Sequence, residues 1–180
     1  MFKFGEKVNR WVEELVKLLP KNSKVLDLGC GMGASSMFLS EKGFEVTCID
    51  KDKGNIEHIK KNYPEINAIN RDILDFDFPE KEYDLVLAVN LLHFFNFEDV
   101  KLLIDKIIKS LKKNGLIYLQ VFSKNNPYKE FPHLFDKKEL EEFFAKNKIL
   151  ELEEFSKKES HPPRGEHEHR IIRALVRKKY

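Results

Sequence analysis

Short apolar runs alternate with amphipathic segments along most of the chain. Runs of about four to eight apolar residues are typical of buried strands, whereas apolar residues three and four positions apart indicate helices. This pattern predicts strands at 24–28, 45–49, 66–70, 84–89, 115–122, 148–155 and 170–177. Helices are expected at 6–19, 33–42, 53–62, 97–112 and 136–146. Such alternation is typical of an α/β fold, a parallel sheet with helices on both faces.

The last two predicted strands follow each other with no helix between them, which predicts a hairpin. The final strand must then run antiparallel to the others. In such a sheet the hairpin turn, expected at 156–170, lies at the carboxyl edge, where open α/β folds bind their ligands.

A glycine-rich turn follows the first predicted strand. Gly29, Gly31 and Gly33 stand at alternate positions, and Asp27 precedes them by two residues. Glycines allow a sharp turn and a close approach of the backbone to a ligand. A carboxylate beside them would repel the pyrophosphate of a dinucleotide, but it would attract the ammonium group of S-adenosylmethionine. The turn therefore favours S-adenosylmethionine as cofactor.

The same glycines also satisfy the loose G-x-G-x-x-G/A fingerprint of nicotinamide and flavin enzymes. Asp50 ends the second predicted strand about 20 residues later, where such folds hydrogen-bond ribose hydroxyls. That acid fits either cofactor. A nicotinamide-binding oxidoreductase, a non-catalytic nucleotide-binding module and a turn that serves only packing therefore stay open.

Four segments, 25–33, 46–50, 71–74 and 83–90, resemble the class I S-adenosylmethionine-dependent methyltransferases. The resemblance extends over residues 24 to about 122. It implies a Rossmann-like three-layer sandwich whose seven-stranded, mostly parallel sheet has the order 3-2-1-4-5-7-6 and an antiparallel last strand. In that family the glycine loop lines the methionine part of the cofactor and an acid after the third strand contacts the adenine. The implied cofactor contacts in this chain are Asp27, Gly29, Cys30, Gly31, Gly33, Asp50, Lys51, Asp72, Ile73 and Asn90.

Three loops are expected at the carboxyl edge, at 90–97, 123–132 and 156–170, and to enclose one substrate pocket together with the first helix. His93, in the first loop, either faces the transferred methyl group or belongs to an aromatic wall with its phenylalanine neighbours.

The third loop is rich in histidine, arginine and glutamate. His167 and His169 alternate, so on an extended chain they share one face. We expect them to bind substrate or transfer a proton, with Arg164 or Arg170 neutralising an anionic substrate. A merely solvated turn is the alternative. No metal is expected, because the sequence offers no compelling third ligand for the pair.

Arg10 and Trp11, the segment 131–140 and the closing 165–170 look like those of the tellurite-resistance-type small-molecule methyltransferases. This resemblance implies a small nucleophile as methyl acceptor, with a chalcogen oxyanion such as tellurite or selenite as one candidate. It also places Arg10 and Trp11 among the substrate contacts.

The remaining composition is that of an ordinary cytoplasmic domain. We expect one domain over residues 1–180, as a monomer or homodimer. The net charge is only +2 and the lysines are scattered, which gives no strong nucleic-acid signal, although an RNA or protein methyltransferase remains an alternative. No apolar run suggests a signal peptide or a membrane span. Cys30 and Cys48 lack C-x-x-C spacing and are expected to be buried fillers.

Overall fold

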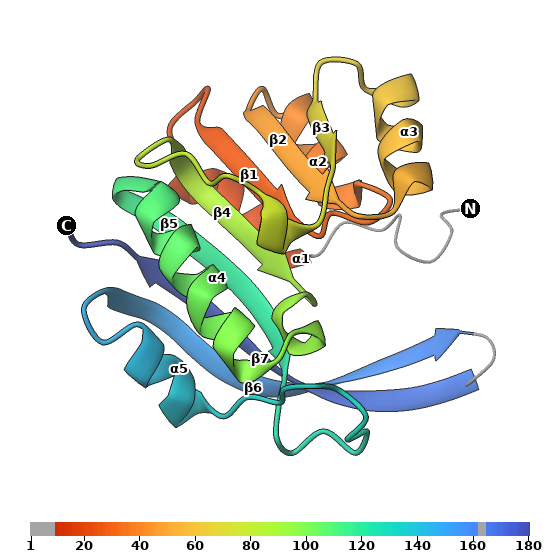
Figure 1. The fold of residues 1–180 in the computed structure, drawn as a ribbon, viewed down its shortest axis with the longest axis vertical. Coiled ribbons are helices and arrows are strands. Elements are labelled where there is room, and N and C mark those ends of the chain that lie inside the picture. Colours follow the sequence, from red (N-terminus) through yellow and green to blue (C-terminus); the bar gives the residue numbers. More distant parts are fainter. Residues whose placement is uncertain (1–9, 162–164) are drawn as a thin grey trace.

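The computed structural model describes residues 10–161 and 165–180. Within these ranges, seven strands form one sheet with the order β3-β2-β1-β4-β5-β7-β6 (Figure 1). The predicted strand order is therefore confirmed. The strands are β1 (Lys24–Leu28), β2 (Glu45–Asp50), β3 (Asn67–Asn70), β4 (Tyr83–Val89), β5 (Leu111–Phe122), β6 (Lys148–His161) and β7 (Gly165–Arg177).

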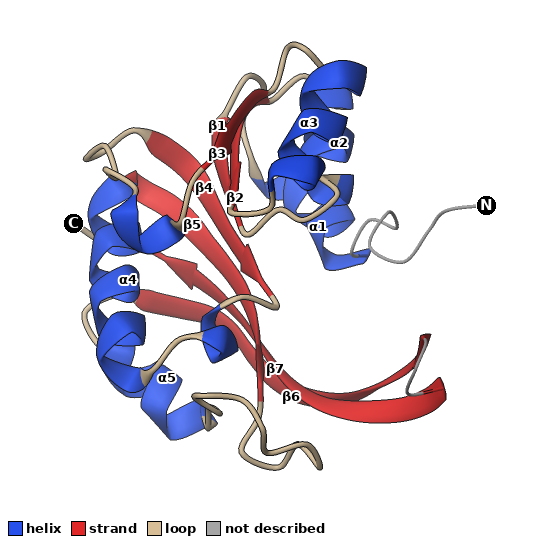
Figure 2. Ribbon diagram, turned by 45° about the vertical axis from the view of Figure 1, so that its right-hand side comes forward, coloured by secondary structure: helices blue, strands red, loops and turns tan. Residues whose placement is uncertain are grey.

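Helices cover both faces of the sheet, which confirms the three-layer sandwich (Figure 2). One layer holds α1 (Arg10–Leu15), α2 (Ala34–Glu41) and α3 (Lys53–Asn62), and the other holds α4 (Phe97–Ser110) and α5 (Lys137–Phe143). Successive strand residues point to opposite faces, so Leu85 and Leu87 pack with the first layer, and Val86 and Ala88 pack with the second. The apolar residues along one side of α4, Val100, Leu103, Ile104 and Ile107, are buried.

Side-chain caps determine where several helices begin. Asp52, Asn96 and Asp136 each accept a backbone N–H from the first turn of α3, α4 and α5, respectively. The predicted first helix, 6–19, is shorter than expected, because α1 ends at Leu15 and continues as the 3-10 helix η1 (Val16–Leu18), while residues 6–9 lie outside the described residues. Two further 3-10 helices are η2 (Ile73–Asp75) and η3 (Leu92–Phe94). Across residues 10–161 and 165–180, no helix combines the length and the apolar character needed to cross a bilayer.

Strand β7 lies between β5 and β6 and runs antiparallel to both, as predicted. Its pairing with β5 begins where Phe122, the last residue of β5, lies opposite Ile171. Since β1 to β5 are parallel, the preceding residues of β7 extend beyond the carboxyl edge of the sheet. Figures 1 and 2 show this part of the β6–β7 hairpin as a ribbon that curves away from the rest of the sheet.

The predicted turn at 156–170 is wrong in extent. Pairing between β6 and β7 continues up to His161 opposite Gly165, so most of this segment is strand. The ribbon lacks the hydrophobic alternation that marks a half-buried strand, and opposite charges such as Lys158 and Glu168 face each other across it instead. Residues 162–164, which include the predicted substrate contact Arg164, lie outside the described residues.

Candidate functional site

A pocket of about 370 Å³ opens at the carboxyl edge of the sheet. Six of the ten predicted cofactor residues line it, together with three apolar residues of the loop after β4. The predicted set consists of Gly29, Asp50, Lys51, Asp72, Ile73 and Asn90, and the apolar set of Leu91, Phe94 and Phe95. The strand ends thus bring the expected residues to one place.

Asp50 is fixed in this pocket by two backbone groups. The Gly31 N–H donates to Asp50 Oδ2 at 2.8 Å, and the Asp52 N–H donates to Oδ1 at 2.8 Å. Each carboxylate oxygen keeps acceptor capacity for another donor. The carboxylate is therefore fixed in orientation and can accept further hydrogen bonds, and its contact with a ribose stays a prediction.

The glycine turn places different demands on its residues. Gly31 has φ +55° and a Cβ built on it would meet nothing within 4 Å. Gly33 has φ +82°, and a Cβ there would lie 2.7 Å from Ile59 on α3. Glycine is therefore required at position 33 because a side chain would collide with α3. At position 31 glycine is favoured by the left-handed backbone conformation, and the space beside the backbone is open.

Asn90 presents an unusual acceptor to the same pocket. It has φ +54°, a left-handed conformation that asparagine tolerates better than most residues. Its side-chain Oδ1 is buried and has no hydrogen-bond partner among the described residues. Asp72 adds a carboxylate, of which one oxygen accepts the Leu74 N–H at 3.0 Å. Acceptors between apolar walls suit a nucleoside with amine and hydroxyl donors.

Asp27 lies below the turn, with 4% of its surface exposed. Burial and, to a smaller extent, the charge of the nearby Asp50 together raise the pKa of Asp27 to about 6, although the Ser36 hydroxyl opposes the rise by donating to Oδ2 at 2.6 Å. It does not belong to the residues that line the pocket, so its contact with a cofactor ammonium stays a prediction. A hydrogen bond with Cys48, together with burial, raises the pKa of the Cys30 thiol, which keeps that side chain neutral.

His93 lies inside an aromatic cluster. It is fully buried in η3, its ring stacks on Phe122 at 3.9 Å, and Phe131 meets it edge-on at 5.1 Å. The Phe122 N–H donates to Nδ1, which leaves the proton of the neutral ring on Nε2. Burial, with the nearby His169, lowers the pKa of His93 to about 3. These contacts support the aromatic wall, and a catalytic role for His93 stays a prediction.

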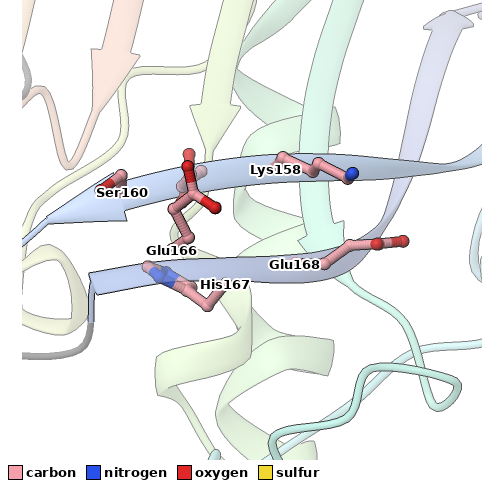
Figure 3. Close-up of a pocket in the computed structure, with 6 residues that line it drawn as sticks. Lys158, Ser160, Glu166, His167 and Glu168 are labelled. Atoms are coloured by element: carbon pink, nitrogen blue, oxygen red, sulfur yellow. The ribbon is translucent and has the colours of Figure 1, made fainter.

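His167 and His169 share one face of β7, as predicted, and both are buried. The His169 ring stacks on Phe122 at 4.4 Å, so Phe122 lies against both His93 and His169. The expectation of one enclosed pocket is nevertheless wrong for the described residues. His167 lines a separate pocket of about 470 Å³, formed by both strands of the hairpin (Figure 3).

The predicted arginine and tryptophan contacts do not gather with the histidines. Arg10 and Trp11 line a third pocket, of about 270 Å³, and the Arg173 guanidinium lies 3.2 Å above the Trp11 ring. Arg170 is exposed and points to the strand face opposite His169, because adjacent strand residues alternate. Substrate roles for Arg10, Trp11 and Arg170 stay predictions that this arrangement does not favour.

The expectation that the histidine pair lacks a third ligand is wrong. Strand pairing places Glu159 directly opposite His167, on the face that also carries His169. One carboxylate oxygen of Glu159 and a ring nitrogen from each histidine all lie within 4.8 Å of one another. The sequence prediction missed Glu159 because the strand pairing that places it opposite His167 lies within the segment 156–170, which was expected to be a turn.

Comparison with known proteins identifies relatives of the chain. The family described as "Methyltransferase domain" matches residues 25–115, about half of the chain. The ubiquinone biosynthesis O-methyltransferase of Rickettsia conorii is 31% identical over 105 residues, covering 56% of this chain and 35% of that protein. The probable S-adenosyl-L-methionine-dependent methyltransferase TehB of Haemophilus influenzae is 29% identical over 141 residues, covering 73% of this chain and 48% of that protein.

The crystal structure of TehB from Haemophilus influenzae superposes with a TM-score of 0.85 at 24% identity, covering 96% of this chain and 63% of that one. This match confirms the fold. The chain spans about a third of the Rickettsia relative and about half of the Haemophilus relative.

Asp27→Asn should change how stability depends on pH. Below about pH 4 the carboxyl is protonated in the folded and the unfolded chain, so no charge is buried; above about pH 6 the folded protein buries the charge. As the pH rises between these values, the wild type should lose roughly 2 to 3 kcal/mol of unfolding free energy relative to the variant. Urea denaturation of both proteins between pH 4 and pH 8 measures this, and a difference that does not change with pH would contradict the buried charge.

Gly31→Ala should weaken S-adenosylmethionine binding by about tenfold or more, because its methyl group enters the open side of the turn and the backbone is strained. Gly43→Ala is the matched control. Gly43 has φ +85° and open space around its Cβ position, but it precedes the amino end of β2, away from the pocket. Both variants should lose about 1 to 2 kcal/mol of stability, and only Gly31→Ala should lose affinity by calorimetry. Equal affinities would make the glycine turn a packing element only.

Proposed function

This chain belongs to the methyltransferase domain family, and we propose that it transfers a methyl group from S-adenosylmethionine to a small-molecule nucleophile. S-adenosylmethionine is the cofactor of the family. The observation that carries the proposal for this chain is the pocket at the carboxyl edge. It combines apolar walls with the acceptor oxygens of Asp50, Asp72 and Asn90.

The hydrogen-bond acceptors of the pocket support the cofactor assignment, one cofactor group at a time. Asp50, fixed by two backbone N–H groups, would accept from the two ribose hydroxyls. Asp72 and the backbone at Ile73 would recognise the adenine amine, with Phe95 and Leu91 as apolar walls for the ring. The unpartnered Oδ1 of Asn90 would accept an N–H of the cofactor, and Asp27 would complement its ammonium. The carboxylates of Asp50 and Asp72 would instead repel a dinucleotide pyrophosphate.

Methyl transfer from the sulfonium is an in-line displacement in which the acceptor's lone pair bonds to carbon and sulfur keeps the old electron pair, releasing S-adenosylhomocysteine. The protein contributes positioning and exclusion of water. Phe94 lines the pocket, and the rings of His93 and Phe131 lie beside it. Aromatic faces attract a cationic group. The cluster would therefore hold the reacting centre in a dry, weakly negative environment without a charged catalytic base.

The acceptor is proposed to be small and nucleophilic, with chalcogen oxyanions as the finer candidate. The similarity to the Haemophilus protein TehB, a probable S-adenosyl-L-methionine-dependent methyltransferase, supports the methyl-transfer reaction. Phe94, which is 58% exposed, lies at the rim between the cofactor pocket and the aromatic cluster. An acceptor that enters beside Phe94 would reach the pocket next to the aromatic cluster.

Asp50→Ala should reduce affinity for S-adenosylmethionine by about 1.5 to 3 kcal/mol, because it removes charge-assisted hydrogen bonds to the ribose. Isothermal titration calorimetry measures the loss. Asp105→Ala is the control, since Asp105 lies on the exposed side of α4 and pairs only with Lys109 among the ion pairs of the described residues. Unchanged affinity in Asp50→Ala would remove the ribose contact from the proposal.

The reaction itself is tested by release of S-adenosylhomocysteine, followed by chromatography, when the protein is incubated with S-adenosylmethionine and single acceptors. Tellurite, selenite, a thiol and a phenol form a suitable panel, with an unstructured RNA as the macromolecular comparison. Acceptor-dependent release with at least one small molecule is expected, and Asp50→Ala should reduce it. Release that depends only on RNA would overturn the small-molecule assignment.

A further inference from the structure

We propose that the β6–β7 hairpin binds one divalent transition-metal ion, such as Zn²⁺, through Glu159, His167 and His169. This site is separate from the cofactor pocket, and the proposal goes beyond methyl transfer. Two imidazoles and one carboxylate leave at least one coordination position for water or an anion, an arrangement that suits borderline divalent ions.

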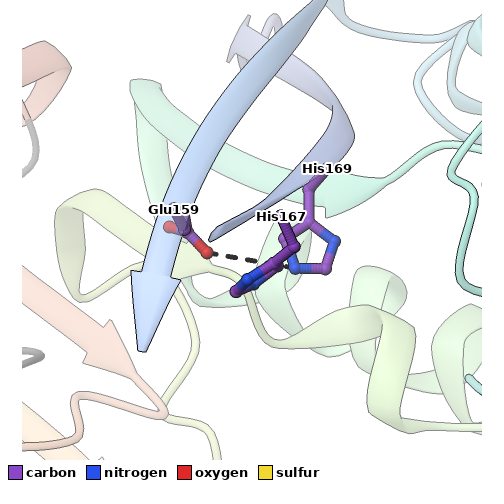
Figure 4. A group of neighbouring side chains, drawn as sticks. All are labelled: Glu159, His167 and His169. Carbon is purple, nitrogen blue, oxygen red and sulfur yellow. Dashed lines mark ion pairs between the residues drawn. The ribbon is translucent and has the colours of Figure 1, made fainter. Parts of the chain in front are cut away.

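The pairing of the two strands builds the ligand set. Directly opposite residues of an antiparallel pair share a face, and so do residues two apart on one strand. Glu159 lies opposite His167, and His169 is two residues further along β7. The three side chains therefore converge above one face of the ribbon, as Figure 4 shows.

The distances are close to those that an ion needs. Glu159 Oε2 lies 4.0 Å from His169 Nε2, and all three ligand atoms lie within 4.8 Å of one another. Bonds of about 2.0 to 2.2 Å to a tetrahedral ion place ligand atoms roughly 3.4 Å apart, so a contraction of about 1 Å suffices. The Glu159 side chain, 18% exposed at the end of three rotatable bonds, can supply most of this movement.

Hydrogen bonds to Nδ1 orient both histidine rings, as is usual for metal-binding histidines. His167 Nδ1 lies 2.8 Å from the Gly165 carbonyl oxygen, which can only accept, so Nδ1 carries the proton and Nε2 the lone pair. His169 Nδ1 lies 3.2 Å from Asn126 Oδ1. Ring N–H groups bonded to backbone or side-chain oxygens are the usual outer shell of metal-binding histidines.

The orientation of the Asn126 amide is itself determined. Its Oδ1 also accepts the Arg170 N–H at 3.1 Å, and its Nδ2 donates to the Tyr128 carbonyl at 3.0 Å. Asn126 is fully buried, so this arrangement is enclosed. His169 must therefore donate through Nδ1, and the Nε2 that faces Glu159 is the atom available to a metal.

An ion can reach the cluster from solvent. Glu159 and His167 line the open hairpin pocket of about 470 Å³ (Figure 3). Lys157 pairs with Glu159 through the other oxygen, Oε1, at 2.6 Å and so leaves Oε2 directed at the histidines. The competing arrangement is a protonated His169 paired with Glu159, which would need no metal.

Metal binding is tested on the whole protein after removal of any affinity tag. Calorimetry with Zn²⁺ and visible absorption with Co²⁺ at pH 7.5 should show one saturable ion for each chain. His169→Phe keeps a ring against Phe122 but removes the ligand nitrogen, and Glu159→Gln keeps the shape but removes the charge. Each should weaken the dissociation constant at least about 100-fold, more than the loss of an outer contact.

Two variants serve as controls. Glu166→Gln changes a carboxylate that lines the same pocket but lies outside the cluster, and His58→Gln removes a histidine of α3. Both should bind Zn²⁺ like the wild type. No saturable binding by the folded wild type, or wild-type binding by His169→Phe and Glu159→Gln, would overturn the metal site and favour the protonated pair. S-adenosylmethionine affinity should remain unchanged in all four variants, which separates this test from that of the cofactor pocket.

Discussion

Strand β7 runs against its neighbour β5, and the position of every candidate group on the hairpin depends on this reversed direction. The first residues of β7 consequently lie at the carboxyl edge of the sheet, beyond the last residue of β5. A parallel final strand would carry the same residues to the opposite edge. The alternation of β7 then places His167 and His169 on the α1 side of the sheet with Arg173, and Arg170 on the other side.

The carboxyl edge of the sheet also concentrates groups that lower the stability of the folded protein. Asp27 is buried with a raised pKa, the amide oxygen of Asn90 is buried without a partner among the described residues, and Asn90 and Gly31 have left-handed backbones. Such features cluster at binding sites because a ligand compensates them. A ligand with hydrogen-bond donors and a positive charge would compensate both the buried carboxyl of Asp27 and the amide oxygen of Asn90. A dinucleotide pyrophosphate would add negative charge to them, which is the physical argument against the nicotinamide alternative.

The parts predictable from sequence were those encoded locally. The glycine turn and Asp50 at a strand end located most of the cofactor pocket. The absence of a helix between the last two predicted strands indicated the hairpin, and the resemblance to the class I methyltransferases supplied the strand order. The length of the hairpin was missed because its outer part pairs polar and charged residues across the two strands, and such residues produce no apolar period. Glu159 and Asn126 were missed for a related reason. Each contacts a histidine that is distant in sequence, and such a contact can be predicted only when the strand register is known. The position of Arg170 on the strand face opposite His169, by contrast, could have been predicted from the alternation of side chains alone.

The ring stack of His93, Phe122 and His169 gives the two proposed sites a common wall. Methyl transfer converts a cationic sulfonium into a neutral thioether, so a nearby positive charge opposes cofactor binding and favours the transfer step. The uncharged rings of Phe122 and His93 separate the proposed metal ion from the proposed cofactor pocket and keep its charge at a distance from the sulfonium. The neutral state of His93, which its burial and the nearby His169 both favour, is what a wall between two positive centres requires.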